Sequence, residues 1–358
     1  MNVSDLFKLM VEKQASDLFL RTMAYPRARI YGSVEIIHDK KLGREEMAGI
    51  TNFLLENEQR RKEFYETWDV DFIHDEPEIG RFRINIFMQR GTPAIVARYV
   101  HSQVKSFDSL NLPVDLCEKV ATESKGLFLV CGPAGNGKST TIASILEYIN
   151  THQSKHIVTI EDPIEYLFVD NKSLINQREL GIDVPSYLSA LKHVTQQSSD
   201  IIYIGNIRDV NTMRAAITAT ELGNFVMTTF HTINAVQTII RVVNFFPPHQ
   251  HDEVRMQLSL ILRGTFSLRL VPCKDGEGRV PAMETMVVTP TIARLIRENR
   301  IREIQNFIDE GDMFGMLSFK KSLVGLVQTD QVDEDVARSF ADSKDDFDLE
   351  LKGLKRSI

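Results

Sequence analysis

A glycine-rich segment between two regular elements constrains this chain more than any other feature. Residues 132–139 read Gly-Pro-Ala-Gly-Asn-Gly-Lys-Ser, which matches the pattern G-x-x-x-x-G-K-[ST]. The apolar run at 127–131 predicts a buried strand before the segment, and the apolar spacing at 139–150 predicts a helix after it. A phosphate-binding loop requires this context, so the chain is predicted to bind a nucleoside triphosphate, ATP with Mg²⁺.

The residue types of the loop fit this chemistry. Glycines let backbone N–H groups converge on the β-phosphate, Lys138 reaches the β and γ oxygens, and Ser139 is a ligand for Mg²⁺. The N-terminus of the following helix favours negative charge. The candidate nucleotide-binding residues here are Gly132, Pro133, Ala134, Gly135, Asn136, Gly137, Lys138, Ser139 and Thr140.

Strands and helices alternate after this loop. Apolar runs at 157–160, 201–204 and 225–229 predict strands, while segments near 186–195 and at 210–220 predict helices. This alternation is typical of an α/β domain with a mainly parallel sheet that helices cover on both faces. Ligands of such domains bind at the carboxyl ends of the strands. We assign the core to residues 114–288.

The flanking segments predict further units. A helix at 3–14, a strand at 18–20, and a strand pair suggested by residues 28–37 and the alternating run 81–88 predict an α+β domain over 1–102. Residues 103–113 are polar and predict a linker. Amphipathic segments at 292–298, 301–309 and 319–327 predict a helical cap within 289–358. The tail from Asp330 is acidic, and the mixed run 352–358 at its end predicts a solvated or frayed end rather than a binding arm.

Composition excludes several classes of protein. The formal charge is −7 and no basic patch stands out, so we expect no nucleic-acid partner. The cysteines Cys117, Cys131 and Cys273 show no metal-ligand spacing, which favours reduced thiols. No apolar stretch reaches about 18 residues, and the N-terminus lacks the regions of a signal peptide. We therefore expect a soluble, intracellular protein.

Four further segments follow the loop in order: residues 159–165 (TIEDPIE), 201–209 (IIYIGNIRD), 228–232 (TTFHT) and 241–247 (RVVNFFP). Together they resemble the Asp box, Walker B and His box of the secretion ATPase superfamily. The chain is most similar to the PilT/PilU branch, the hexameric motors that retract type IV pili. Residues 14–18, 80–85, 176–179 and 314–316 also look like that branch, and the tail at 337–349 looks more like PilU than PilT.

The resemblance implies an architecture and a setting. It implies a PAS-like N-terminal domain, a RecA-like ATPase domain, and ATP bound between domains and subunits of a homo-hexameric ring. It also implies a cytoplasmic protein that is peripheral at the inner-membrane base of the pilus. The implied partners are the inner-membrane pilus platform protein and a paralogous motor ATPase.

Carboxylates follow the second predicted strand. An ATPase needs a carboxylate to orient or deprotonate the attacking water, and Glu161, Asp162 and Glu165 stand at the expected end of that strand. A solvated acidic turn is the alternative interpretation. The resemblance implies that Glu165 is the catalytic glutamate, that Glu161 assists it, and that Asp162 and Asn206 contact the nucleotide.

Other candidates carry positive charge. Arg81 and Arg83 share one face of a strand, because side chains alternate with period two; a solvated sheet face would look the same. The resemblance implies that these arginines and Arg98 reach the nucleotide as fingers. It also implies that His231 senses the γ-phosphate and that Arg241 contacts phosphate or a subunit interface, whereas a structural histidine and a helix salt bridge are the alternatives.

The chain departs from the family at two motif positions. Asn206 stands where the Walker B glutamate is expected, and Asn224 stands where the family usually has histidine. An amide neither holds Mg²⁺ as an anion nor accepts a proton, so binding is expected to survive better than turnover. Two functions stay open: a pilus-retraction ATPase, and an ATP-binding ring subunit with weak hydrolysis that assists a paralogous motor. A nucleic-acid translocase is disfavoured by the acidic balance.

Overall fold

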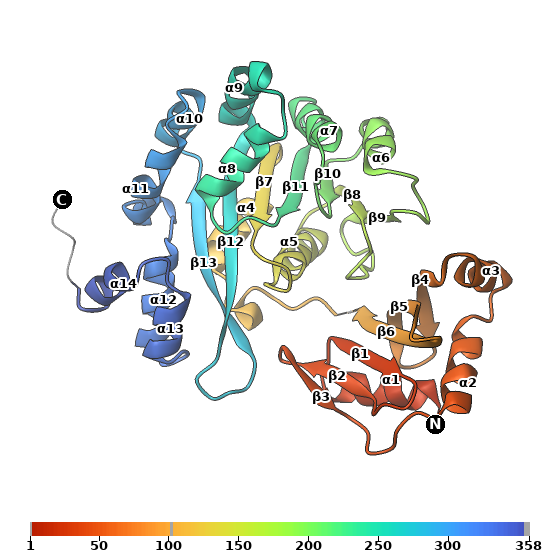
Figure 1. The fold of residues 1–358 in the computed structure, drawn as a ribbon. Helices are drawn as coiled ribbons and strands as arrows, with labels where there is room; N and C mark the ends of the chain where they lie inside the picture. Colours follow the sequence, from red (N-terminus) through yellow and green to blue (C-terminus); the bar gives the residue numbers. More distant parts are fainter. Residues whose placement is uncertain (1, 101–102, 354–358) are drawn as a thin grey trace. The chain divides into compact units, whose positions relative to one another are not determined.

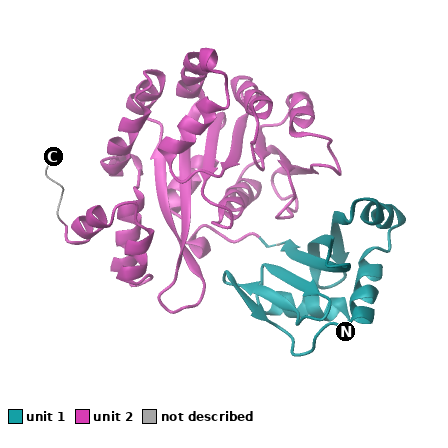
Figure 2. Ribbon diagram, in the orientation of Figure 1, with its two compact units in different colours: residues 1–103 teal, residues 104–358 magenta. Residues whose placement is uncertain are grey.

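The computed structural model describes residues 2–100 and 103–353. The chain divides into two compact units, one ending at Gln103 and the other beginning at Val104 (Figure 2). Residues 1 and 101–102, which the sequence analysis places in the first domain, and residues 354–358 of the tail lie outside the described part. Among the described helices, none is both long and apolar enough to cross a bilayer.

The first unit is an antiparallel sheet with three helices, labelled in Figure 1. Its strand order is β3-β2-β1-β6-β5-β4. The strands are β1 (Asp17–Arg21), β2 (Arg27–Ile30), β3 (Ser33–Ile36), β4 (Asp69–Glu76), β5 (Gly80–Gln89) and β6 (Thr92–Val100). The helices are α1 (Val3–Glu12), α2 (Arg44–Leu54) and α3 (Glu58–Thr67). The α+β prediction is confirmed, although the sequence patterns did not identify β4, β6, α2 or α3.

One face of this sheet carries the core of the first unit. The apolar positions of α1 recur with helical spacing, so Leu6, Phe7 and Met10 are all buried. Phe7 stacks on Phe82 of β5 with a centroid separation of 4.1 Å. Because strand side chains alternate, burying Phe82 and Ile84 leaves their odd-numbered neighbours on the opposite face.

The second unit is built on a seven-stranded sheet of order β13-β12-β7-β11-β10-β8-β9. The strands are β7 (Gly126–Cys131), β8 (His156–Glu161), β9 (Leu174–Glu179), β10 (Ile201–Ile204), β11 (Phe225–Phe230), β12 (Leu262–Pro272) and β13 (Arg279–Val287). Only the β12–β13 pair among these neighbours is antiparallel. The mainly parallel sheet expected from the alternating strands and helices is therefore confirmed.

Helices cover both faces of this sheet. They are α4 (Val114–Ala121), α5 (Lys138–His152), α6 (Tyr187–Val194), α7 (Val210–Glu221), α8 (Ala235–Asn244), α9 (His251–Ile261), α10 (Pro290–Arg297), α11 (Ile304–Asp309), α12 (Phe319–Gln328), α13 (Glu334–Phe340) and α14 (Lys344–Leu351). Strand β7 shows why two layers are needed. Leu127 and Leu129 pack with Met213 of α7, whereas Phe128 packs with Ile145 of α5 on the other face.

The segment expected to be a linker packs on the second unit. Phe107 and Leu112 are about 5 and 6% exposed and join the core cluster that contains α4 and α5. The Ser144 hydroxyl of α5 also donates to the carbonyl oxygen of Lys105 at 2.8 Å. Two buried apolar side chains hold this polar segment in place, which its composition alone does not reveal.

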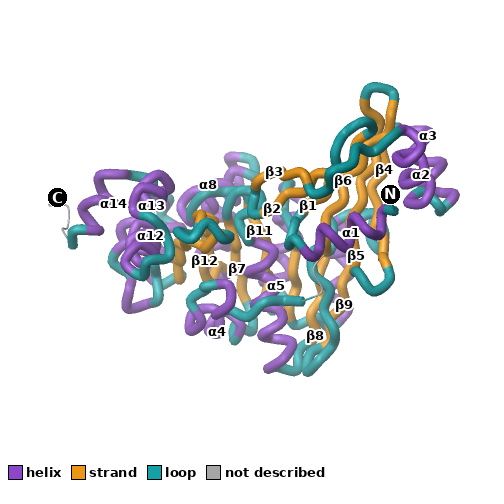
Figure 3. Tube along the Cα trace, turned by 90° about the horizontal axis from the view of Figure 1, so that it is seen from below, coloured by secondary structure: helices purple, strands orange, loops and turns teal. Residues whose placement is uncertain are grey.

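The acidic tail from Asp330 is largely helical, and most of the run 352–358 that was expected to be a solvated end lies outside the described residues. Helices α12, α13 and α14 gather beside strand β12 (Figure 3). Ala337 and Phe347 are fully buried there, in a cluster with Val271 of β12 and Leu323 of α12. These apolar side chains hold the acidic tail against the strands, which its acidic composition alone does not indicate.

Candidate functional site

Four strands of the parallel sheet end at the same edge and deliver the predicted motifs to it. Strands β7, β8, β10 and β11 run parallel, and their last residues are Cys131, Glu161, Ile204 and Phe230. The phosphate loop, the acidic segment 161–165, Asn206 and His231 follow these ends directly. The sheet thus brings together residues that lie up to about a hundred positions apart, at the edge where α/β domains bind ligands.

The phosphate loop connects β7 to α5 in a shape that excludes side chains. At Gly132 the backbone φ is +147°, and a Cβ atom there would lie 2.6 Å from the carbonyl oxygen of Leu268. Asn136 ties the loop to β12, because its Oδ1 accepts the N–H of Leu270 at 2.8 Å. The loop is therefore a preformed cradle against β12, as polyphosphate binding by backbone N–H groups requires.

Lys138 lies inside this cradle. Its Nζ donates to the carbonyl oxygens of Gly132 and Pro133, each at 2.9 Å, and lies 3.4 Å from Nδ1 of His231. Burial lowers the pKa of Lys138, and the charge of Glu165 acts in the opposite direction. A buried ammonium whose hydrogen bonds go to neutral acceptors is suited to meet phosphate charge.

The first turn of α5 is fixed by two tyrosines that the sequence analysis missed. The hydroxyls of Thr140 and Tyr166 lie 2.8 Å apart. Tyr203, which is 5% exposed on β10, forms a hydrogen bond with Ser139, and burial raises its pKa well above the usual value. Position within an apolar strand gave no sign that Tyr203 would reach the candidate Mg²⁺ ligand.

Glu161 is a buried carboxylate at the end of β8. Its Oε1 accepts the Thr159 hydroxyl at 2.6 Å and the Gln177 amide at 3.3 Å. Burial raises the pKa of Glu161 to about 7, with the charge of Glu165 adding to the rise and these hydrogen bonds opposing it. Thr159 stands two residues before Glu161 on the same strand, so strand periodicity was the signal that could have found it.

The rest of the acidic segment is more open. Glu165 is exposed, and its charge acts on both Lys138 and Glu161, which places it at the same site. Asp162 lies on the other side, with Oδ2 3.9 Å from Nη1 of Arg208. The three acidic residues therefore differ in environment: Glu161 is buried and has a raised pKa, Asp162 is partly exposed beside Arg208, and Glu165 is exposed near Lys138.

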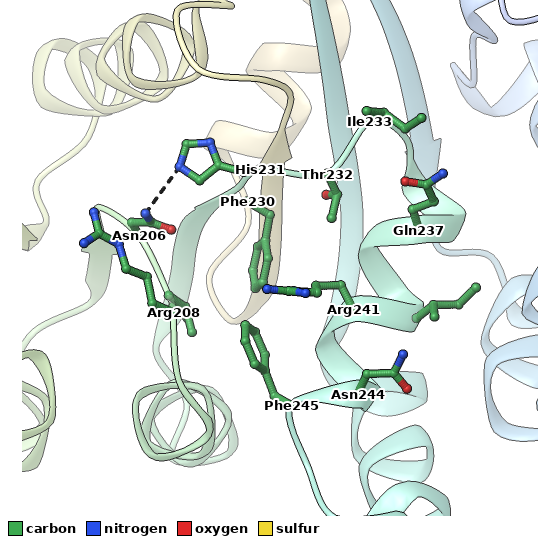
Figure 4. A pocket seen from close by; sticks show the side chains of 12 residues that line it. Asn206, Arg208, Phe230, His231, Thr232, Ile233, Gln237, Arg241, Asn244 and Phe245 are labelled. Carbon is green, nitrogen blue, oxygen red and sulfur yellow. Dashed lines mark hydrogen bonds between the residues drawn. The ribbon is translucent and has the colours of Figure 1, made fainter.

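His231 stands between Lys138 and Asn206. Its Nε2 lies 3.4 Å from the side-chain amide of Asn206, as the dashed line in Figure 4 marks. Burial lowers the pKa of His231, and the positive charges of Lys138 and Arg208 lower it further, so the neutral imidazole is favoured. Because Lys138 can only donate, its contact makes Nδ1 the acceptor and leaves the ring proton on Nε2. The Asn206 amide, whose Nδ2 lies nearest Nε2, then has to turn so that Oδ1 accepts this proton.

A cavity of about 780 Å³ opens beside this histidine. Figure 4 shows Arg208 and Arg241 at its walls, with Arg241 extending from α8 toward Phe245. The Arg241 guanidinium lies 5.4 Å from the centroid of the Phe245 ring, and among the described residues it forms no ion pair. The lining residues are Asn206, Ile207, Arg208, Phe230, His231, Thr232, Ile233, Gln237, Ile240, Arg241, Asn244 and Phe245.

Asn224 lies away from this site. It precedes β11, whereas His231 follows the same strand, so about 20 Å of strand separates them. Its amide donates to the carbonyl and, at 3.2 Å, to the hydroxyl of Ser199. The side chain at position 224 therefore lies at the opposite edge of the sheet from the phosphate loop.

The three candidate finger arginines share one sheet face in the first unit. Arg83 and Arg98 are cross-strand neighbours, and Arg81 is two residues from Arg83 on β5. Each faces an aspartate of its own unit: the Arg83 Nε lies 2.9 Å from both oxygens of Asp71, the Arg98 Nε 2.9 Å from Asp17, and the Arg81 Nε 3.8 Å from Asp75. Their approach to a nucleotide stays a prediction.

Metal binding by protein groups alone is not supported. Within residues 2–100 and 103–353, no cluster of three or more His, Cys, Asp and Glu side chains could hold an ion. Mg²⁺ is commonly bound through one or two protein ligands together with phosphate oxygens and water. Ser139, with the carboxylates of 161–165 nearby, fits that mode, so Mg²⁺ would enter with the nucleotide.

Comparison with known proteins gives consistent matches. Residues 78–334 match the type II/IV secretion system protein family. The type IV pilus ATPase PilU of Pseudomonas aeruginosa is 35% identical over 98% of this chain and 92% of its own length. The type IV pilus retraction ATPase PilT of the same organism is 36% identical over 97% and 100%. A crystal structure of the pilus retraction motor PilT with bound ADP covers 97% of this chain and 98% of its own, with a TM-score of 0.87 and 36% identity.

The parallel sheet, the phosphate loop and the acidic edge define a P-loop ATPase with a RecA-like core. The matches make the assignment narrower. The chain belongs to the type II/IV secretion system protein family, and within that family it is a pilus ATPase of the PilT/PilU type.

Proposed function

We propose that this chain is an ATP-hydrolysing motor that drives retraction of type IV pili and thereby twitching motility. The observation that carries the proposal is the meeting of Lys138, His231 and the acidic segment at one sheet edge. High-coverage similarity to PilU and to the PilT retraction motor supports the cellular role.

Each residue of the site has a chemical part in this proposal. Lys138 holds the β and γ phosphates, and Glu165 orients and deprotonates the attacking water while Glu161 assists it. The neutral His231 donates from Nε2 to a γ-phosphate oxygen and reports its presence. When bound, Mg²⁺ neutralises phosphate charge and orients the γ-phosphate, with Ser139 as its protein ligand.

Arginines of the first unit complete the site in the proposed ring. Arg81, Arg83 and Arg98 would stabilise the charge that develops on the γ-phosphate, with the arginines of one subunit serving a neighbour. Arg81 is the first candidate, because its buried Nε has no hydrogen-bond partner within the described part of the chain. In a closed ring of six subunits, every nucleotide site would have a neighbouring subunit to supply these arginines.

The second candidate function is an ATP-binding ring subunit with weak hydrolysis that assists a paralogous motor. Asn206 favours it, because an amide supplies no negative charge beside the nucleotide. We place both functions at the cytoplasmic side of the inner-membrane pilus base, with the platform protein as the partner of the ring.

Steady-state phosphate release by the purified chain with ATP and Mg²⁺ distinguishes the two functions. A motor is expected to turn over at about 1 s⁻¹ or faster, and an accessory subunit more slowly than that. Lys138→Ala serves as the inactive control. Retraction is tested in cells that lack the chain: the parent restores twitching, and Lys138→Ala does not. A parent chain that binds no nucleotide would contradict both functions.

Ring assembly is tested separately by light scattering. A mass close to six chains is expected in the presence of ATP and Mg²⁺, since trans-acting arginines need neighbouring subunits. A chain that stays monomeric at high concentration under these conditions would remove the basis for the arginine assignment.

A further inference from the structure

The loop that carries His231 is anchored through the first turns of α8. The Thr238 hydroxyl lies 2.6 Å from the Thr232 hydroxyl and 3.1 Å from Sγ of Cys131. Cys131 is the last residue of β7 before the phosphate loop. The position of α8 therefore fixes the His231 loop against the base of the phosphate loop.

A buried carboxylate holds the N-terminus of that helix. Glu284 of β13 is 2% exposed, and its Oε1 accepts the backbone N–H of Ala235, the first residue of α8, at 2.8 Å. Among the described residues Glu284 forms no ion pair. The positive end of a helix favours such an anion, and Figure 1 shows α8 lying across β12 and β13.

The second oxygen of the same carboxylate faces the C-terminal cap. Oε2 of Glu284 accepts the side-chain amide of Gln305 on α11 at 3.2 Å. Gln305 also lies 3.4 Å from Oδ1 of Asp309 on its own helix. A helix cap alone would need one acceptor oxygen, and here the other oxygen joins α11 to the first residue of α8.

We propose that Glu284 is a positioning residue that couples the His231 loop to α11 of the C-terminal cap, through Ala235 on one side and Gln305 on the other. This inference rests on the proposed function, since it assigns the coupling to the nucleotide site of an ATPase. Movement of the His231 loop on nucleotide binding shifts the start of α8, and the buried bonds of Glu284 carry that shift to α11.

Hydrogen exchange tests the coupling without requiring turnover. Deuterium uptake of residues 301–311 is measured with and without ADP and Mg²⁺ in the parent chain and in Gln305→Leu. The parent is expected to show slower exchange in this segment when nucleotide is bound. Gln305→Leu is expected to lose about half or more of that difference while its affinity for ADP stays within about twofold.

The matched control is Gln257→Leu. Gln257 also donates its amide to a glutamate, Glu221, at 3.0 Å, but on the surface between α9 and α7. Gln257→Leu is expected to show the same nucleotide effect on deuterium uptake of residues 301–311 as the parent chain. An unchanged nucleotide effect in Gln305→Leu would overturn the proposal, and so would a parent chain whose residues 301–311 do not respond to nucleotide.

Turnover provides the second measurement. Gln305→Leu is expected to lower kcat about three- to tenfold with KM nearly unchanged, as for a coupling residue remote from substrate. Glu284→Gln keeps an oxygen for Ala235, and Gln305 can rotate its amide to match, so it is expected to keep more of kcat than Glu284→Ala. The coupling would be contradicted if Glu284→Gln and Glu284→Ala lowered kcat equally, or if Gln305→Leu raised KM without lowering kcat. Absence of turnover in the parent would count against the proposed function, and the exchange measurement would still decide this inference.

Discussion

Nε2 of His231 lies 3.4 Å from the side-chain amide of Asn206. Since Nδ1 faces the Lys138 ammonium, Nε2 bears the proton. The Asn206 atom at this distance is Nδ2, so the amide complements that proton only when it is turned to present Oδ1 instead. A carboxylate at position 206 would accept the same proton with a full negative charge. The residue at 206 therefore sets the charge beside the histidine that contacts the phosphate-binding lysine.

Restoring that charge is expected to accelerate turnover. Asn206→Glu should raise kcat at least about tenfold with little change in KM, because a carboxylate there would help to position Mg²⁺ and the attacking water. Steady-state kinetics of the parent and the variant check this. Asn206→Gln, which lengthens the side chain without adding charge, is the control and should give no gain. An unchanged kcat with a raised KM would instead indicate that the new carboxylate, crowded by Glu161, Asp162 and Glu165, repels the nucleotide. That result is expected for an accessory subunit.

Loss of the phosphate-loop lysine is expected to abolish nucleotide binding. Lys138 is the side chain of the loop placed to neutralise the β and γ phosphates, and its Nζ already lies in the cradle. Calorimetry with ADP and Mg²⁺ should show no measurable heat for Lys138→Ala. Lys192→Ala, at an exposed position on α6, is the matched control and should bind as the parent does. Unchanged affinity in Lys138→Ala would remove the phosphate-loop interpretation.

Glu161 should make stability depend on pH. Burial raises the pKa of this carboxyl from 4.5 to about 7, so between these values the folded chain holds a proton that the unfolded chain has lost. The free energy of unfolding therefore falls as pH rises through this window. The cost is on the order of 1 to 3 kcal/mol and is complete above about pH 7.

Glu161→Gln removes this titration. Thermal unfolding of nucleotide-free parent and variant at pH 5 and pH 8 isolates the effect, because the other groups are shared. The variant should gain stability relative to the parent at pH 8. A difference between the two proteins that is the same at both pH values would show that Glu161 titrates normally.

The C-terminal helices should contribute to stability. Phe347 of α14 is fully buried against the strands and α12, so Phe347→Ala should cost about 3–5 kcal/mol through lost burial and a cavity. The control is Phe314→Ala, since Phe314 is about half exposed and should cost less than about 1 kcal/mol. Thermal or urea unfolding measures both. Similar small losses in the two variants would mean that α14 is not packed as described.

Much of the fold was accessible from sequence because its signals are local. Apolar spacing predicts the strand and the helix on either side of residues 132–139. The residue types of the loop between them predict phosphate binding. The strand at 201–204 is recovered with the same bounds, since three of its four residues are isoleucines and all four are buried. In contrast, strands β4 and β6 were not predicted, because polar residues are mixed with the apolar ones along each strand.

The sequence by itself determined which chemical groups follow the strands of the parallel sheet. These groups are the phosphate loop, the three acidic residues of 161–165, Asn206 and His231. Tertiary structure decided which of these groups interact. It buried Glu161 and raised its pKa to about 7, placed Tyr203 against Ser139, moved Asn224 to the far edge, and joined Glu284 to both α8 and α11. The physical reason is that desolvation and hydrogen bonding depend on distances across the sheet, between residues that the chain order keeps far apart.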